Sequence, residues 1–222
     1  MRVIIVAGGV GLRMKTDTPK QFLELSGKPV LIHSLMAFAD VCEGSLPVVV
    51  MCHSQLERWK NLCKKHNFTM PHRIVGGGAT RFYSVKNGLS AIPDEEQGLV
   101  AVHDAVRPLV SRKTIEECIK AAKKFGCAVP AIPVVDTVRE VDYQNNNRMI
   151  DRAELRLIQT PQIFDIKLLK KAYKQEYTDD FTDCASVFER AGNKIYLTEG
   201  NVENIKITTA HDLKIAEALL DF

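Results

Sequence analysis

Apolar runs and amphipathic segments alternate along the first 132 residues of the chain. Short apolar runs predict strands, and apolar residues that recur every three or four positions predict helices. The expected strands are Val3–Ala7, Pro47–Cys52, Arg73–Val75, Leu99–His103 and Cys127–Ile132. The expected helices are Leu31–Ala39, Ser54–His66, Thr80–Ile92 and Ser111–Phe125. This alternation predicts an α/β fold with a mostly parallel sheet and helices on both of its faces.

Three loops are expected to meet at one edge of this sheet. They begin at Gly8, Gly76 and Asp104, and each follows a predicted strand. Right-handed crossovers place the carboxyl ends of parallel strands along the same edge. Residues of these loops are therefore the first candidates for a common binding site.

The pattern changes after Pro133. Polar and apolar residues alternate from Thr137 to Val141, a polar turn follows, and alternation returns at Met149–Ile150 and Leu155–Leu157. This predicts a β-hairpin arm over residues 137–158 that leaves the main sheet. An isolated hairpin is only marginally stable in water, so we expect the arm to pack on a second subunit or, alternatively, on its own domain.

The remainder of the chain returns to helices and one strand. The expected helices are Ile166–Tyr177, Thr182–Gly192 and Thr209–Leu220, with a strand at Lys194–Leu197. Asp212 follows Thr208 and Thr209 at the spacing of a helix cap. Since the chain contains no repeat or interdomain linker, residues 1–222 are expected to form a single domain into which the arm is inserted.

Composition and charge narrow the function classes. The net charge of +3 is mild and the basic residues are spread along the chain, which does not predict a nucleic-acid interface. No apolar run approaches the ~20 residues that span a membrane, and the start of the chain has no signal-peptide pattern. The six cysteines include no C-x-x-C pair, so reduced thiols in a cytoplasmic protein are expected. The histidines also lack metal-binding spacing, whereas a Mg²⁺ ion carried by phosphates stays open.

A glycine-rich loop follows the first strand. Residues 7–21 read AGGVGLRMKTDTPKQ, and their cations include Arg13 and, beyond Pro19, Lys20. Glycines allow backbone N–H groups to face an anion, and the cations add charge-assisted hydrogen bonds to phosphate oxygens. The loop does not match a P-loop, because no Gly-Lys-Ser or Gly-Lys-Thr follows at the required spacing. It does not match a dinucleotide fingerprint either, because Met14 occupies the third glycine position. A glycine turn with solvated cations is the alternative.

Three later loops carry further candidate residues. Asp104 and Arg107 follow the strand that ends at His103, Arg81 follows three glycines, and Lys206 lies between two isoleucines. Each has a purely structural alternative. Asp104 and Arg107 could form a salt bridge within their loop, and Arg81 could be solvated on a helix capped by Thr80. Lys206 could be an exposed lysine on an edge strand. Together with Arg152 on the arm, they predict a site for two phosphorylated ligands.

The order of several motifs resembles that of the sugar-alcohol-phosphate cytidylyltransferases. The motifs are AGGVGLRM, TPKQF, GGGATRFYSV, VHDAVRP, PVVDTV, QTPQIF, TDCAS and NIKITTAHDL. The chain is most similar to the 2-C-methyl-D-erythritol 4-phosphate cytidylyltransferase family, over nearly its whole length. The resemblance implies a Rossmann-like nucleotidyltransferase fold and transfer of the cytidylyl group of CTP to methylerythritol phosphate, with release of pyrophosphate.

The resemblance also implies roles for individual residues. Arg13, Lys20 and Lys206 would be catalytic. The residues expected to bind CTP are Ala7, Gly8, Gly9, Gly11, Arg13, Lys20, Gly78, Arg81, Ser84, Asp104, Ala105 and Lys206. The residues expected to bind the polyol phosphate are Arg107, Thr137, Arg152, Thr182 and Lys206. Thr137 and Arg152 would come from the partner subunit of a homodimer. Mg²⁺ would be held by the CTP phosphates, with Asp104 as a candidate ligand.

Three alternatives stay open. Ribitol 5-phosphate cytidylyltransferases share the paired Gly8–Gly9 and the HDAVRP motif, whereas SVKNGL, PVVDT and TDCAS favour the methylerythritol branch. A non-catalytic nucleotide-binding protein on the same fold is a second possibility, and a sugar-1-phosphate nucleotidylyltransferase that uses UTP or GTP is a third.

Overall fold

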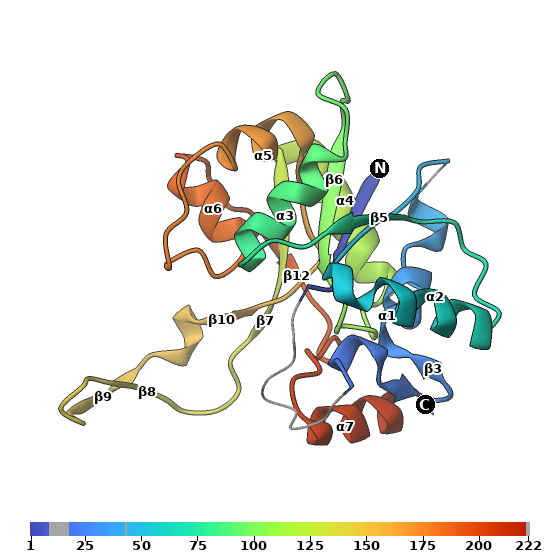
Figure 1. Ribbon diagram of the computed structural model, residues 1–222. Coiled ribbons are helices and arrows are strands. Elements are labelled where there is room, and N and C mark those ends of the chain that lie inside the picture. Colours follow the sequence, from blue (N-terminus) through green and yellow to red (C-terminus); the bar gives the residue numbers. More distant parts are fainter. Residues whose placement is uncertain (9–17, 43, 221–222) are drawn as a thin grey trace.

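The computed structural model describes residues 1–8, 18–42 and 44–220 (Figure 1). The strands of the main sheet are β1 (Arg2–Val6), β4 (Val48–Met51), β5 (Arg73–Gly76), β6 (Leu99–Asp104), β7 (Cys127–Pro133), β10 (Arg156–Ile158), β11 (Gln162–Asp165) and β12 (Leu197–Glu199). Two small antiparallel pairs are β2 (Glu24–Leu25) with β3 (Lys28–Pro29), and β8 (Val138–Val141) with β9 (Asn147–Ile150). The α-helices are α1 (Val30–Met36), α2 (Leu56–Lys65), α3 (Arg81–Ser90), α4 (Arg112–Phe125), α5 (Ile166–Ala172), α6 (Cys184–Arg190) and α7 (Ala210–Leu220).

The main sheet has the strand order β10-β7-β11-β6-β1-β4-β5, and β12 pairs with β7. The pairs β6–β1, β1–β4, β4–β5 and β12–β7 are parallel. This confirms the predicted parallel core of the sheet. One consequence is that the ends of β1 and β6 lie level, with Val6 opposite Asp104.

One strand of the sheet was not predicted. β11 lies between β6 and β7 and is antiparallel to both. Its four residues begin with Gln162 and end with Asp165, so only Ile163 and Phe164 are apolar. Such a short run has no recognisable period, and its strand conformation depends on neighbours on both sides.

Several predicted boundaries also differ from the structure. The strand expected at Lys194–Leu197 is Leu197–Glu199 instead, although the Tyr196 carbonyl already accepts a hydrogen bond from the Val129 N–H of β7 at 2.9 Å. The helix expected from Thr182 begins at Cys184, since Asp183 caps it by accepting a hydrogen bond from the Ser186 N–H. Similarly, the helix expected over Ile166–Tyr177 ends at Ala172.

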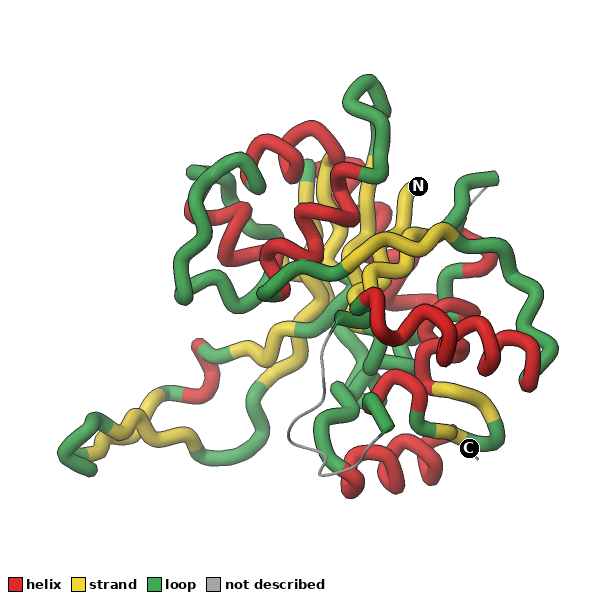
Figure 2. Tube along the Cα trace, viewed as in Figure 1, coloured by secondary structure: helices red, strands yellow, loops and turns green. Residues whose placement is uncertain are grey.

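Helices cover both faces of the sheet, as predicted (Figure 2). Helices α1, α2 and α4 pack on one face, where Val3 and Ile5 of β1 are buried. Helices α3, α5 and α6 pack on the other, where Ile4 is buried. Gly88 lets α3 approach the sheet closely, since a Cβ atom there would lie 2.9 Å from the Ile4 side chain. No helix in the described part of the chain is long and apolar enough to cross a membrane.

Helix α7 completes a small third core beside the β2–β3 pair. Its Ala216 is buried with Leu25, Val30, Val106 and Ile207. The predicted cap of this helix is present, because the Asp212 carboxylate accepts hydrogen bonds from the Thr208 and Thr209 backbones. Burial of Ile207 also directs the neighbouring Lys206 away from this core.

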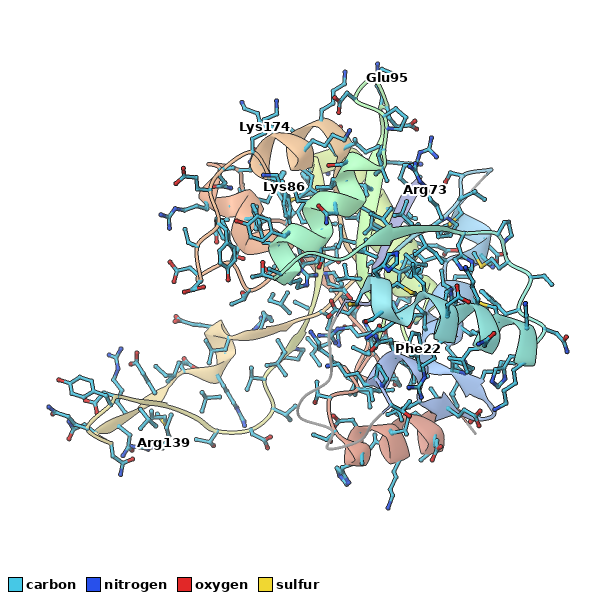
Figure 3. All side chains as sticks on the ribbon, in the orientation of Figure 1. Phe22, Arg73, Lys86, Glu95, Arg139 and Lys174 are labelled. Carbon is cyan, nitrogen blue, oxygen red and sulfur yellow. The ribbon has the colours of Figure 1, made fainter. Side chains whose placement is uncertain are left out.

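The arm extends away from the α/β body (Figure 1). Strands β8 and β9 pair only with each other among the described residues. The segment 156–158, expected to belong to the arm, instead forms β10 and pairs with β7 of the main sheet. The hairpin is therefore shorter than predicted. Figure 3 shows Arg139 on the arm, away from the side chains of the body.

Candidate active site

A cavity of about 280 Å³ lies at the carboxyl ends of β1 and β6, beside the start of α3. It is lined by all of the residues expected to bind CTP that the structure describes, namely Ala7, Gly8, Lys20, Gly78, Arg81, Ser84, Asp104, Ala105 and Lys206. Gly9, Gly11 and Arg13 lie outside the described residues. The loops at Gly8, Gly76 and Asp104 thus meet at one edge, as the parallel topology predicted.

Ser84 of α3 forms two hydrogen bonds to the loop that begins at Gly76. Its Oγ donates to the Thr80 carbonyl and accepts the Gly78 N–H at 3.1 Å. Gly78 has to be glycine in this arrangement, because a Cβ would lie 2.3 Å from the Tyr83 Cβ. A Cβ on Gly8 would lie 3.3 Å from the same Ser84 oxygen. Close backbone approach therefore shapes this wall of the cavity.

Lys20 lies in a 3-10 turn, η2 (Lys20–Phe22), on another wall. The next residue, Gln21, is buried and donates to the Ala7 carbonyl at 2.9 Å and to the Gln55 side chain at 2.8 Å. Gln21 was not among the predicted site residues. Its amide anchors the Lys20 turn to the end of β1, so the position of Lys20 follows that strand.

Asp104 is the centre of a charged cluster. Its carboxylate lies 2.9 Å from Lys206 Nζ, 3.4 Å from Arg81 and 3.5 Å from Arg107. Burial opposes its ionisation, but the charges of Arg81, Lys206 and Arg107 outweigh burial and hold the pKa of Asp104 well below its ordinary value. One carboxylate thus faces three cations, which leaves an excess of positive charge that suits a polyphosphate.

The charged cluster around Asp104 determines whether its carboxylate is available to a metal ion. Both carboxylate oxygens of Asp104 face cations, and the described residues contain no group of three His, Cys, Asp or Glu that could hold an ion. The expected role of Asp104 as a direct ligand does not fit this arrangement. A Mg²⁺ ion coordinated by phosphate oxygens requires no such protein cluster.

Hydrogen bonds that involve Thr160 and His103 hold the backbone at Asp104 in place. The Asp104 N–H donates to Thr160 Oγ1 at 3.1 Å, and Thr160 Oγ1 lies 3.0 Å from His103 Nδ1. His103 Nε2 faces the Arg107 carbonyl at 3.0 Å. Since a carbonyl only accepts, Nε2 carries the proton and Nδ1 accepts from Thr160. Burial lowers the pKa of His103 to about 4, in keeping with a neutral ring.

Arg81 has a second partner besides Asp104. Its Nη1 donates to the sulfur of Cys184, at the start of α6, at 3.4 Å. The Tyr173 hydroxyl donates to the same sulfur at 3.2 Å. Burial raises the pKa of the Cys184 thiol, so this group is neutral. The sequence offered no signal for this contact between residues 103 positions apart.

Arg107 is placed behind the cavity and does not line it. Its guanidinium donates to the carbonyls of Asn204 and Ile158, and only 12% of its side chain is exposed. These bonds hold the segment that carries Lys206 against the end of β6. In this arrangement Arg107 supports the site, and the structure does not bring it to the position expected of a ligand-binding residue.

The other residues expected to bind the polyol phosphate also lie outside the cavity lining. Thr182 is exposed just before α6. Thr137 and Arg152 are exposed on the arm side of the molecule, where Arg152 donates to the Val135 carbonyl. Within one chain, the structure therefore gathers the predicted nucleotide residues and leaves the predicted substrate residues apart.

Comparisons with known proteins agree with this geometry. The family model described as 2-C-methyl-D-erythritol 4-phosphate cytidylyltransferase matches residues 1–221. An enzyme of that name from Phocaeicola vulgatus is 50% identical over 218 residues, with 98% of each chain covered. One from Bacteroides thetaiotaomicron is 49% identical over the same length and coverage.

A solved structure has the same fold. The crystal structure of 4-diphosphocytidyl-2C-methyl-D-erythritol synthase from Anaerococcus prevotii superimposes with a TM-score of 0.83 at 31% identity, covering all of this chain and 98% of the other. The relatives carry the name of the methylerythritol branch, which the TDCAS and PVVDT motifs had favoured over the ribitol branch. The chain therefore belongs to the IspD family of 2-C-methyl-D-erythritol 4-phosphate cytidylyltransferases, which are nucleotidyltransferases.

Proposed function

We propose that the protein transfers the cytidylyl group of CTP to 2-C-methyl-D-erythritol 4-phosphate. The products are 4-diphosphocytidyl-2-C-methyl-D-erythritol and pyrophosphate, in the synthesis of isoprenoid precursors. The observation that carries this proposal is the convergence of Lys20, Arg81 and Lys206 around Asp104 in one cavity, in a chain of the IspD family.

The reaction needs positioning and charge stabilisation more than proton transfer. An oxygen of the substrate phosphate attacks the α-phosphorus of CTP in line with the bond to the leaving pyrophosphate. The nucleophile is already anionic, so no general base is required. Lys20 and Arg13 would stabilise charge that develops at the α-phosphorus, and preorganised cations are effective there. Lys20 lines the cavity, while Arg13 lies outside the described residues.

Lys206 would contact both phosphorylated ligands. Its ammonium group lies 2.9 Å from Asp104, yet 42% of its side chain is exposed. A flexible lysine at the mouth of the cavity can remain near Asp104 and reach phosphate oxygens of either ligand. Asp104 would then limit the excess positive charge that these cations concentrate when no nucleotide is bound.

Mg²⁺ is proposed as the cofactor, carried by the CTP phosphates. When bound there, the ion holds the triphosphate in one shape and neutralises part of its charge. The protein's own contribution is the set of cations that face the same oxygens.

We infer that the substrate half of the site is completed by a second subunit. Thr137 and Arg152 belong to the arm side, while Thr182 borders the body. The arm also exposes apolar side chains, including Val141 at 56%, Tyr143 at 94% and Met149 at 69%. An exposed hairpin with such residues is expected to pack on a partner. A homodimer would bring Thr137 and Arg152 of each arm to the other subunit's cavity.

We propose that the protein acts in the cytoplasm. We also propose that it binds neither nucleic acid nor a membrane. The six cysteines are free thiols, all within the described ranges, which suits a reducing compartment.

The test is a pyrophosphate-release assay with CTP and Mg²⁺. Methylerythritol phosphate should support rapid release, and ribitol 5-phosphate should support little. Faster release with ribitol phosphate would contradict the proposed substrate. UTP or GTP used as well as CTP would contradict the nucleotide assignment. Binding of CTP without release by either polyol phosphate would instead indicate a non-catalytic protein.

A further inference from the structure

Cys184 has an unusual environment for a buried cysteine. Its side chain is fully buried, but its sulfur accepts hydrogen bonds from Arg81 at 3.4 Å and from the Tyr173 hydroxyl at 3.2 Å. Arg81 in turn lines the cavity and pairs with Asp104. A single thiol thus connects the start of α6 with a cation of the proposed nucleotide site.

The position of this sulfur is set by Gln162 of β11. Gln162 is buried, and its Oε1 accepts the N–H groups of Cys184 and Ala185, both at 3.0 Å. Its Nε2 donates to the Asp183 carboxylate at 2.7 Å. Three hydrogen bonds from one side chain therefore fix the first turn of α6 to the sheet. The sulfur cannot shift unless this clamp also shifts.

The protonation state of Cys184 affects how much positive charge Arg81 keeps for a ligand. The Cys184 thiol is neutral, so it holds one guanidinium nitrogen without cancelling its charge. Asp104 holds the other nitrogen but shares its single charge among three cations. The guanidinium is therefore held at two points while its positive charge remains available to an anionic ligand.

We propose that Cys184 is a positioning residue, clamped by Gln162, that aims Arg81 at the nucleotide in the cavity. This inference rests on the proposed function, since it takes CTP as the ligand. Loss of the sulfur would free one nitrogen of Arg81 and loosen its hold on the nucleotide. Arg81 is not among the residues expected to bind the polyol phosphate, so binding of that ligand would be affected less.

The test compares two variants at Cys184 by titration calorimetry with CTP. Cys184→Ala removes the acceptor and should raise the Kd for CTP about fivefold, the scale of one ordinary hydrogen bond, because a neutral thiol is a weak acceptor. Cys184→Ser keeps an acceptor and should stay within about twofold of the parent protein. In turnover assays, the KM for CTP should rise more than the KM for the polyol phosphate.

Cys118 provides a matched control. It is also fully buried and has one polar contact, to Thr198 Oγ1 at 3.1 Å, but it lies on α4 away from the cavity. Cys118→Ala should lower the melting temperature and leave the Kd for CTP unchanged. An equal rise in Kd for the two alanine variants would show a general effect of core packing and would overturn the proposal.

Gln162→Glu gives a second test, in case Cys184→Ala folds poorly. This change places a carboxylate against Asp183 and should displace the start of α6, so the Kd for CTP should rise as in Cys184→Ala. Folded variants at both positions that bind CTP as tightly as the parent protein would overturn the proposal. A parent protein that binds no CTP would instead refute the proposed function, so the two failures are distinguishable.

Discussion

The cavity and the arm represent opposite ways to build a binding site. At the cavity, the Asp104 carboxylate contacts Arg81 of α3, Lys206 and Arg107, which come from three different segments of the chain. On the arm, Tyr143 is 94% exposed and strands β8 and β9 pair only with each other among the described residues. The cavity is thus organised within one chain, while the arm would gain a surface to pack against only in the proposed dimer. We expect substitutions in the cavity to affect the chemical step, and substitutions on the arm to affect substrate binding and assembly.

The largest effect is expected at Lys20. Lys20→Ala should lower kcat by about 10²–10³-fold, because it removes one preorganised cation that stabilises the charge developing at the α-phosphorus. Arg13→Ala should act on the same scale. The measurement is pyrophosphate release at saturating CTP. Lys60→Ala is the control, since Lys60 is exposed on α2 and pairs with Glu57. Activity within a few-fold of the parent would contradict the catalytic role of Lys20.

The next largest effect is expected for substitution of Asp104, and it concerns the free energy of unfolding. Asp104→Asn leaves three cations without their shared carboxylate and should lower the free energy of unfolding by about 3 kcal/mol at pH 7. The pKa of Asp104 is lowered in the folded state. Below about pH 4 the unfolded chain therefore binds a proton that the folded chain does not, and stability falls on acidification. The variant should lose less stability than the parent protein between pH 5 and pH 3.

Urea unfolding at several pH values measures this prediction. Asp94→Asn is the matched control, because Asp94 also pairs with a lysine, Lys170, but is 99% exposed. Solvent screening should leave that substitution with little effect on stability. Equal losses for the two variants would show that the cluster around Asp104 is not the source of the effect.

A smaller, selective effect is expected at Arg152. Arg152→Ala should raise the KM for the polyol phosphate about tenfold, the free-energy equivalent of one charge-assisted hydrogen bond. The KM for CTP should change by less than about twofold. Arg148→Ala tests the same arm, since Arg148 pairs with Glu140 of the hairpin, and it should change neither constant. Equal changes in both KM values for Arg152→Ala would argue against a role in substrate binding.

The smallest effect is expected at the tip of the arm. Tyr143→Ser should raise the dissociation constant of the dimer about threefold, because residues at the rim of an interface contribute little to binding. Sedimentation equilibrium gives this constant directly, with turnover of the same samples as a control. A monomeric parent protein would contradict the proposed dimer and, with it, the contribution of each arm to the other subunit's cavity.

Much of the cavity could be predicted because its residues follow strands that the apolar pattern identifies. Gly8 lies two residues after β1, Asp104 ends β6 and Ala105 follows it, and parallel pairing of the two strands brings these residues together. Gln21, Gln162 and Cys184 could not be predicted in the same way. Their roles depend on single hydrogen bonds to distant backbone or side-chain atoms, and no local pattern marks a residue for such a contact.

The amino-acid sequence by itself determined most of the order of strands and helices, because apolar spacing reflects which face of each element is buried. It also determined which loops meet, because parallel strands share one edge. Only the tertiary structure decided that β11 enters the sheet between β6 and β7, and that Arg107 supports the site from behind. It also decided that Ala7 and Gly8 line one cavity with Arg81 and Lys206, since packing alone brings together segments that lie far apart in the sequence.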